Sequence, residues 1–201
     1  MRSNRLVRPA AVALAGGLTF GAGYAVSSLQ DSGMKPAQGD EMKFEVPKPG
    51  PEHAELAKSV GTWDAEIESM MGGPPSKSKG IETVKAGPGG LWVLGDIQSE
   101  FMGMPFAGHS VTGYDTSKGK YVGAWVDSMG TYLTTMEGTF DGKTRTGTFF
   151  MEMPDPSSGK AVTHRMVEKW TDDDNRTLEM YAPGPDGKEG MGMRIAYKRR
   201  K

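Results

Sequence analysis

The stretch GTWDAEIESMM, residues 61–71, decides the fold, because its hydrophobic residues recur with a period of two. Trp63, Ala65 and Ile67 alternate with acidic residues at positions 64, 66 and 68. Successive side chains of a strand point to opposite faces of the sheet. The stretch therefore predicts a β-strand with one buried face and one face in water.

The same pattern continues downstream between short turn sequences such as GPGG, DTSKGK and DDDN. The chain contains 29 Gly and 13 Pro, and both residues favour turns between strands. The further strands are expected at residues 79–86, 91–101, 107–115, 121–127, 131–140, 145–153, 161–171, 177–181 and 191–198. None of the connections between them is long enough for a crossover helix, so the sheet is predicted to be antiparallel.

About ten short-looped strands in one domain either close on themselves or fold into two packed sheets. Closure removes exposed strand edges. The sequence therefore favours an all-β, antiparallel up-and-down β-barrel, with a β-sandwich as the alternative. A barrel of this size can enclose one small ligand.

Upstream of the strands, residues 52–60 predict a short helix, which Gly61 ends. Residues 30–51 are polar and rich in Pro and Gly, which is typical of a flexible linker. The barrel domain is therefore expected over residues 52–201.

The N-terminus carries the pattern of an export segment. Arg2, Arg5 and Arg8 precede residues 9–29, which contain no charge. A basic start followed by an apolar run is typical of a signal peptide, here cut after Ala25, or of an N-terminal membrane anchor. Residues 1–29 therefore predict a domain outside the cytoplasm, in the periplasm or cell envelope. Contact with a membrane is expected only through this segment.

Composition excludes several classes of function. The chain has no Cys, which rules out disulfides, thiolate catalysis and zinc ribbons. The net charge of −1, without a basic aromatic strip, argues against nucleic-acid binding. Phosphate-binding loops and H-E-x-x-H motifs are absent from the sequence. Nothing in the sequence defines an oligomeric state.

Several blocks resemble known proteins. The GTW at residues 61–63 resembles the G-x-W opening of the calycin barrels, which include the lipocalins. The blocks GMPFAGHSVTGYD, KGKYVGAWVDSMGT and EMYAPGPDGKEG resemble an uncharacterised bacterial family, the domain of unknown function 1579. The resemblance implies a calycin-like barrel and no particular activity. Calycin relatives bind apolar molecules or haem in a cavity, which is an analogy at the level of the fold.

The resemblance also implies that a basic side chain of the last strand covers Trp63 through a cation–π contact. Arg194 occupies the comparable place. Its position alternates with Met193 and Ile195, however, which favours an outward direction.

Three M-x-M pairs suggest a soft-metal site: Met102/Met104, Met151/Met153 and Met191/Met193. Residues i and i+2 of a strand share a face, so each pair in a strand would present two thioethers together. Thioethers combined with an imidazole suit Cu(I). The alternative is that these methionines fill the core or line an adaptable apolar cavity.

Two histidines and one tryptophan complete the candidate site. His164 alternates in phase with Met166 and Trp170, which predicts an inward imidazole. His109 shares its phase with Ala107 and Val111 and is also a candidate for the interior. The residues proposed to contact a ligand are His109, His164, Trp125, Met151, Met153 and Met193.

The sequence thus favours an exported, non-enzymatic calycin-like barrel that holds a small apolar molecule without a cofactor. The first alternative is a protein that binds haem or copper through His and Met side chains. A weaker alternative is an enzyme that uses an inward carboxylate, for which the candidates are Asp96, Glu100, Asp127 and Glu137. No catalytic residue is assigned.

Overall fold

A computed structural model describes residues 45–71, 74–155, 159–184 and 187–201. The expected export segment, residues 1–29, and most of the expected linker lie outside the described residues. The described chain contains a short helix α1 (Pro51–Ala57), a 3₁₀ turn (Pro88–Gly90) and ten strands. The strands are β1 (Gly61–Ser69), β2 (Ser76–Ala86), β3 (Trp92–Phe101), β4 (Met104–Asp115), β5 (Lys120–Asp127), β6 (Thr134–Asp141), β7 (Thr146–Pro154), β8 (Ala161–Trp170), β9 (Asn175–Pro183) and β10 (Glu189–Arg199).

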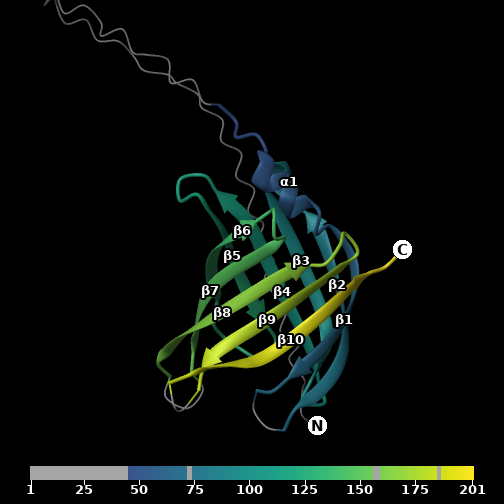
Figure 1. Ribbon diagram of the computed structural model, residues 1–201, viewed down its shortest axis with the longest axis vertical. Helices are drawn as coiled ribbons and strands as arrows, with labels where there is room; N and C mark the ends of the chain where they lie inside the picture. Colours follow the sequence, from purple (N-terminus) through teal and green to yellow (C-terminus); the bar gives the residue numbers. More distant parts are fainter. Residues whose placement is uncertain (1–44, 72–73, 156–158, 185–186) are drawn as a thin grey trace, which may run out of the picture. The chain divides into compact units, whose positions relative to one another are not determined.

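The ten strands form one closed barrel in which each strand pairs with its sequence neighbours (Figure 1). The last strand closes on the first, with Trp63 opposite Arg199 and Ser69 opposite Met193. Every pairing is antiparallel. The predicted up-and-down barrel is therefore confirmed over the sandwich.

Helix α1 covers one end of the barrel (Figure 1). It begins after Gly50 with Pro51 at its first turn, and it ends at Ala57, three residues earlier than expected. Leu56 and Val60 pack against the buried core, and the Tyr121 hydroxyl donates a hydrogen bond of 3.4 Å to the Glu52 carbonyl. These contacts close the end of the barrel at which β1 starts.

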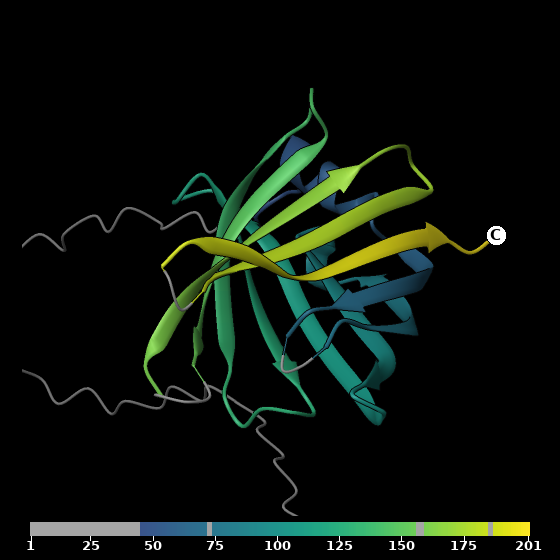
Figure 2. The same ribbon diagram turned by 60° about the horizontal axis from the view of Figure 1, so that its bottom comes forward.

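The opposite end has no such cover among the described residues. Because the strands run up and down, β1, β3, β5, β7 and β9 all end at this side of the barrel, which Figure 2 turns toward the viewer. We refer to it as the mouth of the barrel.

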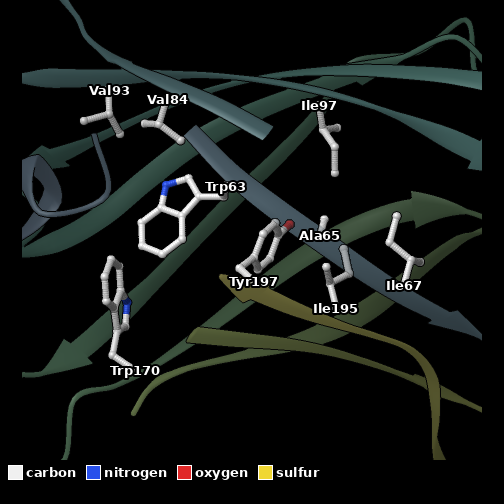
Figure 3. Close-up of a cluster of buried hydrophobic side chains, with 9 residues drawn as sticks. All are labelled: Trp63, Ala65, Ile67, Val84, Val93, Ile97, Trp170, Ile195 and Tyr197. Atoms are coloured by element: carbon white, nitrogen blue, oxygen red, sulfur yellow. The ribbon is translucent and has the colours of Figure 1, made fainter. Parts of the chain in front are cut away.

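The core at the α1 end is built around Trp63, which is fully buried, as the alternation in β1 predicts. Its indole Nε1 donates a hydrogen bond of 2.9 Å to the Ser59 carbonyl, and its ring meets Trp170 edge-on at 5.6 Å. Figure 3 shows these two rings with the aliphatic side chains that surround them. The buried members of this first cluster are Trp63, Ala65, Ile67, Val84, Val93, Ile97, Trp170, Ile195 and Tyr197.

The basic residue that covers Trp63 is not Arg194. The Arg199 guanidinium lies 4.0 Å from the centre of the Trp63 ring and donates hydrogen bonds to the carbonyls of Val60 and Lys58. Arg199 continues the inward phase of β10 two residues beyond Tyr197. Arg194 lies on the outer face, where it forms an ion pair of 3.5 Å with Glu179.

Candidate functional site: a methionine-lined mouth

A second buried cluster lies inside the barrel and consists of methionines. Its buried members are Met151, Met166 and Met180. The partly buried side chains packed against them are Met136, Phe149, Met153, Leu178 and Met193. The structure thus brings together Met151, Met153 and Met193, which the sequence proposed as ligand contacts.

The methionines of the barrel divide into two groups of six. Of the 15 in the chain, Met1, Met34 and Met42 precede the described residues. Six belong to the second cluster, and the other six lie on the connections or strand ends near the mouth: Met70, Met71, Met102, Met104, Met129 and Met191. Leu133 and Met102 are 63% and 60% exposed, and Tyr132 is also exposed there. The mouth therefore has an apolar rim above a thioether-lined interior.

His164 lies on the inner face beside these methionines. On the neighbouring strands, Met136 is opposite Met151 and Met151 is opposite His164. His164 Nδ1 is 3.1 Å from the Val162 carbonyl oxygen. A carbonyl can only accept a hydrogen bond, so Nδ1 carries the proton and Nε2 keeps its lone pair in the neutral ring.

His109 faces outward, contrary to its predicted direction. The inward positions of β4 are Phe106, Gly108, Ser110 and Thr112, because these residues pair with inward positions of β3. His109 instead pairs with Asp96, and its Nδ1 is 2.7 Å from the Asp96 carboxylate on the outer surface. It therefore cannot join the interior methionines.

Trp125 forms part of the inner wall. Its ring stacks on Phe106 at 6.4 Å, and its Nε1 donates a hydrogen bond of 2.8 Å to Asp127. A Cβ atom on Gly108 would lie only 2.2 Å from the Trp125 ring, so glycine is needed where the indole crosses β4.

Met102 lies in the turn between β3 and β4 with a φ of 51°, so it does not share a regular strand face with Met104. In β10 the register shifts between Met191 and Met193. This bulge leaves Met191 opposite Tyr181, while Met193 is opposite Met180 in the interior. The expectation that Met191 and Met193 share one face is therefore wrong.

A buried charged cluster, which the sequence did not indicate, lies at the α1 end. Arg176 donates hydrogen bonds to Glu82 and, at 2.8 Å, to Glu168. Its guanidinium also lies 4.0 Å from the centre of the Tyr197 ring and 4.8 Å from that of Trp63. Among the described residues, the buried Arg176 Nε has no hydrogen-bond partner.

Burial dominates the electrostatics of this cluster. It raises the pKa of Glu82 above the ordinary value of 4.5, Arg176 opposes the shift, and Glu168 adds to it. Burial alone would lower the pKa of Arg176, but the charges of Glu82 and Glu168 raise it. One arginine between two carboxylates thus favours a state in which a carboxyl group retains its proton.

The Glu82→Gln variant is expected to lose part of the pH dependence of stability. The folded state holds the Glu82 proton more tightly than the unfolded chain does. The stability that Glu82 gains by holding this proton is therefore fully present below its ordinary pKa of 4.5. It is lost as the pH rises through the higher pKa of Glu82 in the folded state. The decline in unfolding free energy from pH 4.5 to pH 8 should therefore be smaller in the variant than in the unchanged protein.

Urea unfolding across that pH range measures this difference. Glu68→Gln is the control, because Glu68 lies on the outer face in an exposed ion pair with Lys77. An identical pH dependence in Glu82→Gln and the unchanged protein would show that folding does not raise the pKa of Glu82.

The carboxylates that the sequence proposed for acid–base chemistry are engaged elsewhere. Glu137 is exposed and forms ion pairs with Lys120 and Lys118. Asp127 accepts hydrogen bonds from Trp125 and from the turn amides of Met129 and Gly130. Glu100 is exposed on β3, and Asp96 is the outer partner of His109.

Two hollows lie over the described residues, and both are on the outer face. The first, of about 590 Å³, is lined mainly by outward residues such as Trp92, Val122 and Phe150, and it also reaches Met136 and Met151 of the inner face. The second, of about 530 Å³, surrounds Asp96 and His109. The two side-chain clusters lie inside the barrel, between the strands.

Two features that would favour particular functions are absent from the described residues. No cluster of three or more His, Asp or Glu side chains suited to a metal ion occurs within the described ranges. Over the same residues, no helix has the length and hydropathy needed to cross a bilayer.

The closed barrel, its covering helix and the Trp63–Arg199 contact define a calycin-like protein. Residues 48–199 match the family described as Protein of unknown function (DUF1579), and the chain belongs to this family. No curated protein matches it.

Two solved structures are similar in fold. The crystal structure of Rv2717c from M. tuberculosis has a TM-score of 0.58 and 11% identity, covering 76% of this chain and 99% of that one. The S-type phycobiliprotein lyase CPES from Guillardia theta has a TM-score of 0.49 and 12% identity, with coverage of 76% and 99%. At these identities the likeness concerns the fold alone.

Proposed function

We propose that this protein is exported and holds a small apolar molecule in the methionine-lined half of the barrel. Export is supported by Arg2, Arg5 and Arg8 ahead of the uncharged residues 9–29. The observation that carries the binding function is the asymmetry of the barrel. One end is covered by α1, whereas the mouth has an exposed apolar rim above the second cluster.

The chemistry of methionine explains how an interior packed with side chains can accept an apolar ligand. Its side chain is unbranched, flexible and polarisable, so a cluster of methionines can repack around molecules of different shape. Exposed apolar residues gathered at one place also mark interaction sites. The side chains at the α1 end cannot repack in this way, because they are tied together by direct contacts. Trp63 packs edge-on against Trp170, and Arg176 stacks on Trp63 and forms ion pairs with its carboxylate partners.

Native mass spectrometry of protein purified from its own envelope is the direct test. It is expected to reveal a retained apolar molecule that is lost on denaturation. A Soret absorption band in the same preparation would instead identify the guest as haem. Protein that carries no guest and binds no apolar probe would contradict the proposal.

The place of binding is tested with the neutral probe N-phenyl-1-naphthylamine, whose fluorescence rises in apolar surroundings. Met153→Glu places a charge among the interior methionines and should weaken probe binding more than about tenfold, since an unpaired charge disfavours an apolar guest. Phe150→Glu is the matched control, because Phe150 lies on the same strand and is exposed in the outer hollow. Loss of binding in Phe150→Glu alone would move the site to the outer face and overturn the proposal.

A further inference from the structure

We propose that the interior of the mouth also binds one soft monovalent metal ion, Cu(I), through His164 Nε2 and the thioether sulfurs of Met136 and Met151. This proposal does not rest on apolar-ligand binding, because it depends on sulfur and nitrogen donors and not on apolar surface.

The three donors form one row across β6, β7 and β8. Met136 is directly opposite Met151, and Met151 is directly opposite His164. Residues opposite one another on antiparallel strands have Cβ atoms about 4.5–5.5 Å apart. Their side chains share the inner face, and the proposed site requires the Met136 thioether to turn from Gly123 on β5 toward Met151 on β7.

Gly123, which is opposite Met136 on β5, leaves room for the Met136 side chain on the inner face. A Cβ atom there would lie 2.6 Å from Met136 Cε, so the thioether occupies the space above this glycine inside the barrel. Met153 and Met166 lie on the same face, two residues along β7 and β8 from Met151 and His164. Both belong to the second cluster and provide further thioethers beside the row.

His164 is prepared to act as a ligand. Its Nδ1 donates to the Val162 carbonyl at 3.1 Å, which leaves the Nε2 lone pair for an ion. Metal-binding histidines usually donate their other ring N–H to a carbonyl or carboxylate in this way, which fixes the tautomer and the ring orientation.

The donor set selects the metal. Thioethers are soft, uncharged ligands that favour Cu(I), whereas Ca²⁺ and Mg²⁺ prefer oxygen ligands. A singly charged ion also requires less compensating negative charge than a divalent ion does, and none of the three residues in this row is a carboxylate. We therefore expect Cu(I), and its redox-inert analogue Ag(I), to bind.

The distribution of methionine separates this proposal from ordinary core packing. None of the nine buried residues of the first cluster is methionine, whereas all three of the second cluster are. Leucine has a similar volume and apolarity but no sulfur, so replacing Met by Leu preserves packing and removes the ligand.

The test is an anaerobic titration of the purified chain with Cu(I) in competition with bicinchoninate. One ion per chain is expected. Met151→Leu and His164→Gln should each weaken its binding by about tenfold or more. Met102→Leu is the matched control and should bind as the unchanged protein does, since Met102 lies outside the second cluster and is exposed at the rim.

X-ray absorption at the copper edge provides a second measurement. The unchanged protein should show sulfur and nitrogen neighbours, and His164→Gln should lose the nitrogen neighbour. Unaltered affinity in both Met151→Leu and His164→Gln, or loss only in Met102→Leu, would overturn the site. The N-phenyl-1-naphthylamine probe should still bind Met151→Leu, so failure of the metal site and failure of the apolar site are distinguishable.

Discussion

Replacing Arg176 by Met is expected to reduce the free energy of unfolding by about 3–5 kcal/mol at pH 7, because it leaves two buried carboxylates without their partner. The Arg176 side chain is 8% exposed, and those of Glu82 and Glu168 are 15% and 20% exposed. Such a loss is a large part of the total stability of an ordinary domain, which is about 5–15 kcal/mol.

The loss should depend on pH and on the two carboxylates. Without Arg176, Glu82 can avoid an unpaired buried charge by taking up a proton, so the loss of stability should be smaller near pH 4.5. Adding Glu82→Gln and Glu168→Gln to Arg176→Met should restore most of the stability at pH 7, because the uncompensated charge is then removed.

Arg200→Met is the control for this experiment. Arg200 pairs with Asp64 at 2.5 Å, but both side chains are about half exposed, at 46% and 54%. Exposed pairs contribute about 0–1 kcal/mol. Urea unfolding of both variants gives the comparison, and a loss below 1 kcal/mol in Arg176→Met would show that the buried cluster is solvated.

The strand pattern was predictable because it depends on local signals. Alternation identifies each strand, and Gly, Pro and Asp in the connections identify the turns. The expected strands at residues 79–86 and 161–171 correspond to β2 (Ser76–Ala86) and β8 (Ala161–Trp170), with differences only at their ends. The family match over residues 48–199 agrees with the blocks that resembled it.

The direction of β4 was not predictable from hydropathy. Its inward positions include Gly108 and Ser110, which are less apolar than the outward Ala107 and Val111. Gly108 is required because the Trp125 ring crosses it, and Val111 contributes to the apolar outer hollow. Both facts depend on neighbouring strands, so the local pattern placed His109 on the wrong face.

The buried charges were missed for a related reason. The sequence predicts a turn at DDDN and a strand from residue 177, but β9 begins at Asn175, one residue ahead of Arg176. Its carboxylate partners lie on β2 and β8, 94 and 8 residues away in the sequence. Nothing near Arg176 in the sequence indicates that an arginine there will be paired inside a barrel.

Trp63→Ala is expected to be about as damaging as the loss of Arg176, at about 3–5 kcal/mol. The side chain is fully buried, and it joins the segment after α1, through Ser59, to Trp170 and Arg199. Removing it leaves a cavity at the α1 end of the barrel and leaves the Ser59 carbonyl without the Trp63 hydrogen bond. Urea unfolding measures the loss, and Trp63→Phe gives a milder variant if the alanine variant does not fold.

Trp92→Ala is the matched control, since Trp92 has the same side chain but lies on the outer face at 37% exposure. Its replacement should reduce the unfolding free energy by about 1–2 kcal/mol, because less apolar area leaves water on folding. Equal losses in the two variants would mean that Trp63 does not organise the core. A much larger loss for Trp63 than for Trp92 would show that the packing around Trp63 contributes a large share of the stability of the barrel.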